Sequence, residues 1–268
     1  PPPPPPHPHS SPTRRSSDLT SLHHPILKNA LQALADAHPA QAATLCQRHL
    51  GQVPDDVHAL RILAESALQM NVPLDAERYL QRCLELDPGF HLARLNYVHT
   101  LKRLNKDQAA LTQLEILEKA EPDKVSHQIV KASLLDKMGQ VERAIELYDG
   151  LIARFPRMAS GYNKRGHALK TVGRNEDAIA SYRKAIELSP TKGSAYWSLA
   201  NLKTFRFERA EIRAMWELVT GDKLSSGSDR ASICFALGKA LDDADFHDYA
   251  FKFYYQGNEI MNQLVNPD

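Results

Sequence analysis

Apolar residues recur in short blocks at helical spacing from about residue 23 to residue 262, and polar turns separate the blocks. The block at residues 159–190 shows the pattern best, with the large side chains Tyr162 and Tyr182 and the small residues Gly166 and Ala178. Small residues let two helix backbones approach closely, while large residues fill the space around them. The pattern predicts two antiparallel helices in which Gly166 faces Ala178, and it predicts no strand.

The same block repeats along the chain with a fixed period. Prolines lie at every thirty-fourth position, at Pro54, Pro88, Pro122, Pro156 and Pro190. Alanines follow the same period, at Ala42, Ala76, Ala110, Ala144 and Ala178. A period of thirty-four is that of the tetratricopeptide (TPR) repeat, a pair of helices per unit, and the chain resembles that family. The resemblance implies an all-α fold, a right-handed α-solenoid of about seven TPR-like helix-turn-helix units.

The period also predicts where the units lie. A TPR array is expected at residues 21–222, with units near 23–54, 57–88, 91–122, 125–156, 159–190 and 193–220. A further TPR-like unit is expected in 229–268, with its phase shifted by four residues and Asp229 as the N-cap of its first helix. Positions are counted from the first residue of each unit. Position 15 of four units holds Asn71, Asn105, Gly139 and Gly173, residue types that accept the positive φ found after the C-terminus of a helix.

Composition and charge argue against a nucleic-acid partner and a membrane partner. Lys and Arg total 33 against 32 Asp and Glu, which argues against a nucleic-acid partner because phosphate binding normally needs a basic excess. No stretch approaches the ~20 apolar residues of a membrane span, and we expect a cytoplasmic protein without a membrane partner. Cys46, Cys83 and Cys234 are far apart, and each is expected to be a small buried residue.

The first twenty residues differ from the rest of the chain. Residues 1–20 are rich in proline and lack a hydrophobic period, so they are predicted to be disordered. The run at residues 12–19 resembles the conceptual translation of a sequencing adapter, and we leave residues 1–20 out of functional reasoning. The alternative, a proline-rich ligand for a partner domain, has only the composition behind it.

The C-terminal quarter carries a second resemblance. The strings AYWSLANLKTFRF (195–207), RAEIRAMWEL (209–218) and ICFALGKALDDADFHDYAFKFYYQGNEI (233–260) resemble the region upstream of the catalytic domain in bacterial TPR sulfotransferase proteins. That family uses phosphoadenosine phosphosulfate as the sulfuryl donor and opens its donor site with a PRSGTT-like phosphate loop. No such loop occurs in this sequence, so no catalytic or donor-binding residue carries over and no cofactor is expected. The chain is interpreted as a fragment whose catalytic domain would lie beyond Asp268.

Other site chemistry has little support. His23 and His24 are adjacent and His91 and His99 are eight residues apart, so neither pair is expected to share a metal ion. The sequence contains no HExxH motif, no Cys/His ligand spacing and no GxSxG elbow. We therefore predict no metal site and no catalytic residue among the residues present.

The candidate functional surface is the concave groove of the array, lined by positions 2, 5, 9 and 12 of the first helix of each unit. The predicted peptide-binding groove residues are Arg61, His99, Lys102, Asn163, His167, Lys170, Trp197 and Asn201. Lys102, His167 and Lys170 are expected to favour acidic or polar peptides, more strongly once the histidines are protonated below about pH 6.5. The alternative is that these residues are ordinary solvated surface. No unit has Lys at position 5 with Asn at position 9, the clamp that binds chaperone tails.

Two functions remain open. The first is a non-catalytic TPR scaffold that binds a protein or peptide in its groove. The second is the substrate-recruiting part of a sulfotransferase. Both predict binding without turnover by these residues, and neither the ligand nor the oligomeric state is specified.

Overall fold

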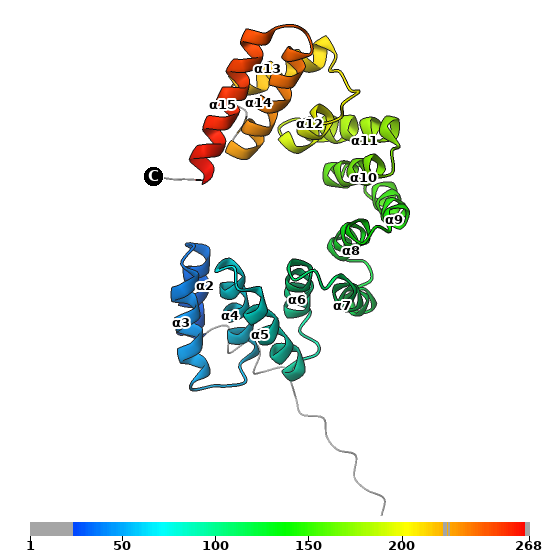
Figure 1. Ribbon diagram of the computed structural model, residues 1–268. Helices are drawn as coiled ribbons and strands as arrows, with labels where there is room; N and C mark the ends of the chain where they lie inside the picture. The colour runs from blue at the N-terminus through cyan, green and yellow to red at the C-terminus, as the bar shows by residue number, and fades with distance from the viewer. Residues whose placement is uncertain (1–23, 222–223, 225, 266–268) are drawn as a thin grey trace, which may run out of the picture. The chain divides into compact units, whose positions relative to one another are not determined.

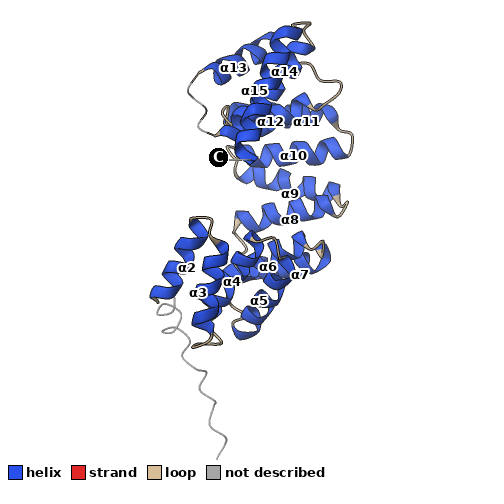
Figure 2. Ribbon diagram, turned by 60° about the vertical axis from the view of Figure 1, so that its left-hand side comes forward, coloured by secondary structure: helices blue, strands red, loops and turns tan. Residues whose placement is uncertain are grey.

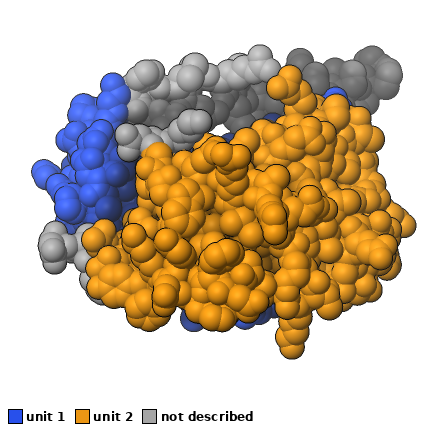
Figure 3. All heavy atoms as spheres, turned by 90° about the horizontal axis from the view of Figure 1, so that it is seen from above, with its two compact units in different colours: residues 1–123 blue, residues 124–268 orange. Residues whose placement is uncertain are grey.

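The computed structural model describes residues 24–221, 224 and 226–265, so the predictions for residues 1–20 lie outside the described residues. These described residues form fourteen α-helices and no strand, as Figure 2 shows. The predicted all-α class is confirmed. The chain divides into two compact units, residues 1–123 (unit 1) and 124–268 (unit 2), which Figure 3 colours separately.

The described residues of unit 1, from residue 24 to residue 123, form three helix pairs, whose helices are labelled in Figure 1. Its helices are α2 (Pro25–Ala35), α3 (Pro39–Leu50), α4 (Val57–Gln69), α5 (Pro73–Leu86), α6 (His91–Arg103) and α7 (Asp107–Ala120). The first helix of each pair packs against the second, α2 on α3, α4 on α5 and α6 on α7. The periodic alanines Ala42, Ala76 and Ala110 are fully buried on the second helices, where they let the partner helix approach.

Unit 2 begins with the same arrangement. Its helices are α8 (Val125–Lys137), α9 (Val141–Arg154), α10 (Ala159–Thr171), α11 (Asn175–Leu188), α12 (Gly193–Ala200), α13 (Arg209–Thr220), α14 (Gly227–Asp242) and α15 (His247–Val265). Pairs form between α8 and α9, α10 and α11, and α14 and α15. The periodic prolines follow the ends of the second helices, because proline has no N–H to continue a helix.

The turn inside each regular pair uses a residue with positive φ. Asn71, Asn105, Gly139 and Gly173 have φ of 60°, 56°, 77° and 77°, as the sequence predicted. In the α10–α11 turn, the next residue donates its N–H to the Leu169 carbonyl at 3.0 Å, which closes the helix end. Two positions that the sequence did not flag adopt the same conformation in the same place, Ala37 (φ 59°) and Asp245 (φ 64°).

In two of the regular pairs, α10–α11 and α14–α15, the helices meet where a glycine faces an aromatic ring. A Cβ added at Gly166 would lie 2.6 Å from Cε1 of Tyr182, and one added at Gly238 would lie 3.0 Å from the ring of Tyr254. The atoms nearest to Gly166 thus belong to the Tyr182 ring, and the contact of Gly166 with Ala178 stays a prediction. The ring of Tyr182 fills the space that the missing side chain leaves, and Ala178 is buried one turn of α11 earlier.

The segment 193–220 departs from the regular pattern. It holds the two expected helices, but the closest helix neighbours of α12 are α14 and α11 rather than α13, and α13 packs against α14. The last pair also begins earlier than expected, because Ser226 is the N-cap of α14. Asp229 lies in the first turn instead, where its carboxylate accepts from the Gly193 N–H at 2.9 Å and from Lys192 Nζ at 3.1 Å. The predicted N-cap thus joins α14 to the start of α12.

All three cysteines are buried, as expected, and unpaired in disulfides. Burial raises the pKa of Cys46 and of Cys83 to about 12, with a smaller contribution from nearby carboxylates. Burial likewise raises the pKa of Cys234 to about 11. These thiols are packing groups.

Candidate functional site

The eight predicted groove residues divide between the two units. Arg61, His99 and Lys102 belong to unit 1, on α4 and α6. The other five belong to unit 2, on α10 and at the end of α12.

Arg61 does not lie on an open surface. Only 8% of the residue is exposed, and its Nη1 donates to Glu65 Oε2 at 3.1 Å. The sequence analysis predicted Arg61 as a residue of the peptide-binding groove; in the structure most of its side chain is buried and paired. Arginine and glutamate four residues apart on a helix can form an ion pair. The aliphatic part of the arginine side chain then packs along the helix while the guanidinium stays next to the carboxylate.

His99 and Lys102 are one turn apart on α6. The residue His99 is exposed and Lys102 is half-buried. Loss of hydration lowers the pKa of His99, and the Lys102 charge lowers it further. The direction of this shift moves the protonation of His99 to a lower pH than the sequence analysis expected.

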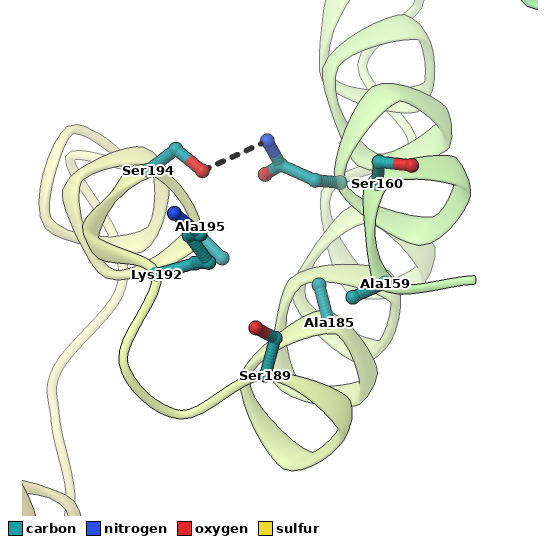
Figure 4. A pocket seen from close by; sticks show the side chains of 8 residues that line it. Ala159, Ser160, Ala185, Ser189, Lys192, Ser194 and Ala195 are labelled. Atoms are coloured by element: carbon teal, nitrogen blue, oxygen red, sulfur yellow. Dashed lines mark hydrogen bonds between the residues drawn. The ribbon is translucent and has the colours of Figure 1, made fainter. Parts of the chain in front are cut away.

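In unit 2 the predicted residues form two neighbouring rows. Asn163, His167 and Lys170 follow one another at intervals of four and three along α10. Trp197 lies on α12, and Asn201 is the C-cap of that helix. Asn163 Nδ2 donates to Ser194 Oγ at 3.3 Å, so the two rows are in contact (Figure 4).

A pocket of about 330 Å³ opens beside this contact. Small and polar side chains of α10, the end of α11 and the start of α12 line it (Figure 4): Ala159, Ser160, Asn163, Ala185, Ser189, Lys192, Ser194 and Ala195. The Oδ1 atom of Asn163 is buried and has no hydrogen-bond partner. A buried acceptor without a donor is costly, so this atom favours a ligand that offers an N–H or O–H group.

His167 is exposed to solvent, and its ring contacts the side chain of Tyr182. Its Nδ1 lies 3.2 Å from the hydroxyl of Tyr182, and the two rings meet edge to face with centroids 5.4 Å apart. Loss of hydration lowers the pKa of His167, and Lys164 and Lys170 lower it further against an opposing effect of Asp136. As for His99, the direction of the shift moves protonation to a lower pH and favours a neutral, hydrogen-bonding side chain near neutral pH.

Trp197 presents the largest apolar surface of the two rows. It is 44% exposed, and its ring lies 5.5 Å from that of Phe235 on α14. Asn201 Nδ2 donates to the Trp197 carbonyl at 2.9 Å. The indole is thus supported on one side by α14 and open on the other.

Of the eight residues that line the pocket, the sequence analysis predicted only Asn163. Ser160 and Ser194 both line the pocket and both occupy position 2 of their units, thirty-four residues apart. A small polar residue repeated at position 2 was the available signal.

The described residues were also compared with the requirements of a metal site and of a membrane-spanning helix. Within residues 24–221, 224 and 226–265, no group of three or more His, Cys, Asp or Glu side chains has an arrangement that could hold a metal ion. None of the helices in this part of the chain combines the length and apolar character of a membrane span.

Comparison with known proteins gives a family for the centre of the chain. A model of the tetratricopeptide repeat matches residues 95–159 and 129–193. Residues 95–193 therefore consist of tetratricopeptide repeats.

Two curated relatives are similar in sequence to parts of the chain. The chain is 31% identical to the Hsp70-Hsp90 organizing protein of Triticum aestivum over 97 residues, which are 36% of this chain and 17% of that protein. It is 25% identical to a TPR repeat-containing protein of Methanocaldococcus jannaschii over 171 residues, 64% of this chain and 28% of that protein. The chain thus spans less than a third of each relative's length.

The crystal structure of YrrB, a TPR protein with an unusual peptide-binding site, superposes with a TM-score of 0.54. It covers 67% of this chain and 95% of its own, at 14% sequence identity. At this identity the likeness concerns the fold alone, an all-α helical repeat.

Proposed function

We propose that the chain is a non-catalytic binding module that holds an extended segment of a partner protein on the α10–α12 surface. This surface consists of Asn163, His167 and Lys170 on α10 together with Ser194, Trp197 and Asn201 at α12. Helical repeats present such rows because each unit places the same positions of its first helix on the same side.

The observation that carries the proposal is the pairing of an exposed indole with an unsatisfied amide. Trp197 offers apolar area, and three residues earlier on the same helix Ser194 accepts from Asn163, whose Oδ1 is left without a donor. A peptide backbone supplies N–H groups for such an acceptor, and apolar side chains supply area for the indole. Large aromatic residues at the centre of an interface commonly contribute much of the binding energy.

The charges of this surface predict a weak electrostatic preference. Lys170 is exposed, and His167 is neutral near pH 7 because its pKa is lowered. The α10–α12 surface is therefore expected to favour acidic or polar peptides through Lys170, with an affinity that falls as ionic strength rises.

A displayed peptide library tests the proposal. Peptides selected on the full chain are titrated against the wild type and against Trp197→Ala. Loss of a central aromatic contact is expected to weaken binding by about thirty-fold, equivalent to about 2 kcal/mol. The Lys170→Ala variant is expected to lower affinity only a few-fold and to reduce the salt dependence.

Lys184→Ala is the matched control. Lys184 lies on α11 and pairs with Glu187 at 2.7 Å, so its removal changes the same charge without touching the α10–α12 surface. Equal binding of the selected peptides by wild type and Trp197→Ala would contradict the proposal.

The chaperone tails suggested by the name of the wheat relative are not proposed as partners. No unit of this chain combines Lys at position 5 with Asn at position 9, and Asn163 and Trp197 occupy position 5 in the two units of the α10–α12 surface. The bound segment is expected to contact an amide and an indole where such a clamp would supply a lysine.

The sulfotransferase alternative stays a prediction from sequence. The strings that carry it have a packing role in unit 2: the Trp197 ring meets Phe235, and a Cβ on Gly257 would lie 2.8 Å from Cε1 of Phe235. The contacts among α12, α14 and α15 account for these residues without reference to a catalytic domain.

A further inference from the structure

A buried arginine without an anionic partner lies in unit 1. Arg94 is in the first turn of α6 and is 8% exposed. Its Nη1 donates to Gln113 Oε1 at 2.5 Å and its Nη2 to the Pro88 carbonyl at 2.6 Å. The Nε atom is buried and has no hydrogen-bond partner.

The position of Arg94 in its repeat makes this charge unexpected. It occupies position 4 of its unit, where the corresponding residues of the other units from residue 57 to residue 220 are uncharged: Leu60, Gln128, Tyr162 and Tyr196. A large apolar residue at this position fills the space between helices, whereas a guanidinium must be desolvated. Packing alone therefore does not account for an arginine here.

The charge of Arg94 is also uncompensated. Both of its hydrogen-bond acceptors are neutral, and among the described residues no carboxylate lies within ion-pair distance of it. Burial lowers the pKa of the guanidinium, and no neighbouring acid opposes that effect. Arginine nevertheless keeps its proton in proteins, so a desolvated cation remains.

A pocket opens at this cation. It has a volume of about 440 Å³ and is lined by Gln81, Leu84, Glu85, Arg94, Tyr97 and Gln113. Gln81 Nε2 donates to the Tyr97 hydroxyl at 3.0 Å, which leaves the hydroxyl proton to point elsewhere. Gln113 uses its carbonyl on Arg94, so its amide nitrogen is left as a donor. The pocket thus combines the Arg94 cation and the Glu85 carboxylate with neutral hydrogen-bond donors.

We propose that this pocket binds a carboxylate of a partner protein, either an acidic side chain or a free chain end. A guanidinium has five N–H groups, of which Gln113 and Pro88 use two. Pairing the remaining donors with a carboxylate compensates the buried charge. The site lies in unit 1 and does not rest on the α10–α12 surface of unit 2.

The local charge favours a carboxylate over a phosphate. Glu85 lines the same pocket and pairs only with the exposed Arg82, at 3.3 Å. One arginine and one glutamate leave no net positive charge to balance a dianion, and the glutamate repels a second negative charge. A monoanion that reaches Arg94 meets less repulsion.

Side-chain NMR of the ¹⁵N-labelled full chain tests the site. The probes are an acetylated pentaglycine with a free C-terminus, the same peptide amidated, the amidated peptide with a central glutamate, and inorganic phosphate. We expect a saturable shift of the Arg94 Nε–H resonance with the free-carboxylate peptide, the glutamate peptide or both, and none with the amidated pentaglycine. Which of the two carboxylate peptides binds distinguishes a chain end from a side chain.

Variants separate binding from packing. Arg94→Gln is expected to weaken carboxylate binding by at least about tenfold, followed at the Tyr97 and Gln113 resonances. Arg78→Gln is the matched control, because Arg78 is 72% exposed on α5 and pairs with Asp75. It removes the same charge from unit 1 and should leave binding unchanged.

Several outcomes would overturn the proposal. They are the absence of a saturable shift with both carboxylate peptides, equal shifts with the amidated pentaglycine, saturation by phosphate alone, or a folded Arg94→Gln that binds like the wild type. If Arg94→Gln unfolds, the wild-type comparison between carboxylate and amidated peptides decides on its own.

Discussion

The regular pair α10–α11 and the irregular segment α12–α13 are neighbours in unit 2 and follow the same period. In the first, Ala178 is fully buried and Gly166 accepts the ring of Tyr182, so the two helices pack closely. In the second, α12 has 8 residues against 13 in α10, and its closest neighbours are α14 and α11. A helix can therefore begin in phase with the repeat and still not pair as the repeat predicts.

The two segments also differ in sequence at the repeat position that is alanine in every regular pair. Position 20 holds Ala178 in the regular pair and Ile212 in the irregular one. A β-branched side chain fits less well than alanine where two helix backbones approach closely. The N-terminus of α12 is joined to α14 instead, through the contact of Gly193 with Asp229. We therefore expect a small residue at position 20 to be needed for two in-phase helices to pair.

Exchanging the residue at position 20 should have the largest effect. Ala178→Ile adds three heavy atoms at a fully buried site and is expected to lower the free energy of unfolding by about 3 kcal/mol. Ile212→Ala removes a half-buried side chain and should cost about 1 kcal/mol. Urea denaturation followed by circular dichroism measures both. Equal costs at the two sites would remove position 20 as the cause of the difference.

A smaller effect is expected where glycine meets tyrosine. Gly166→Ala places a Cβ 2.6 Å from the Tyr182 ring and is expected to cost about 2 kcal/mol. Tyr182→Leu should relieve part of that cost, because the pair Ala64 and Leu80 already occupies the same two positions in unit 1. A double-mutant cycle measures the coupling. Strictly additive effects would show that the glycine and the ring do not determine each other.

Substitutions at the positive-φ residues of two turns should change the stability of the protein in opposite directions. Ala37→Gly relieves an alanine at φ 59° and is expected to raise stability by about 0.5–1 kcal/mol. Gly173→Ala forces an alanine into φ 77° and should lower stability by about 1 kcal/mol. Thermal melting distinguishes the two, and shifts of the same sign would contradict the turn geometry.

The smallest effect is a pH dependence. The folded-state pKa values of His99 and His167 are lowered from 6.5, so the unfolded chain binds more protons as pH falls through that value. Their contribution is fully present above about pH 6.5 and is lost below it. Unfolding free energies measured from pH 7.5 to 5 should therefore fall less steeply for His99→Gln/His167→Gln than for the wild type. A steeper fall in the double variant would reverse the assigned direction.

Much of the fold follows from the sequence, because the period reports packing that every unit needs. The buried Ala at position 20 and the positive φ at Asn71 and Gly173 are both local requirements, and local requirements leave a residue signature. Ala37 and Asp245 adopt the same positive φ without that signature, since the hydrogen bonds of the turn override the preference of the residue.

The candidate site is less predictable. Position numbering placed Asn163 and Trp197 on adjacent helices, but it could not show that Asn163 Oδ1 lacks a donor. It also could not show that Arg61, predicted as a groove residue, is only 8% exposed, because a position in the repeat does not say how far a long side chain is buried. The sequence analysis did not single out Arg94, because position 4 is a packing position in the repeat. Only the structure shows that its guanidinium has neutral hydrogen-bond partners and a buried Nε without one.

The buried cysteines have a practical consequence for following ligand binding. With the pKa values of Cys46, Cys83 and Cys234 raised to about 12, 12 and 11, almost none of the native thiol is ionised at neutral pH, and maleimides react with the thiolate. A single cysteine introduced on the solvent-facing side of α11, for example Lys184→Cys, can be labelled while the three native residues stay in place. Fluorescent reporters can thus be attached near the α10–α12 surface without a cysteine-free background.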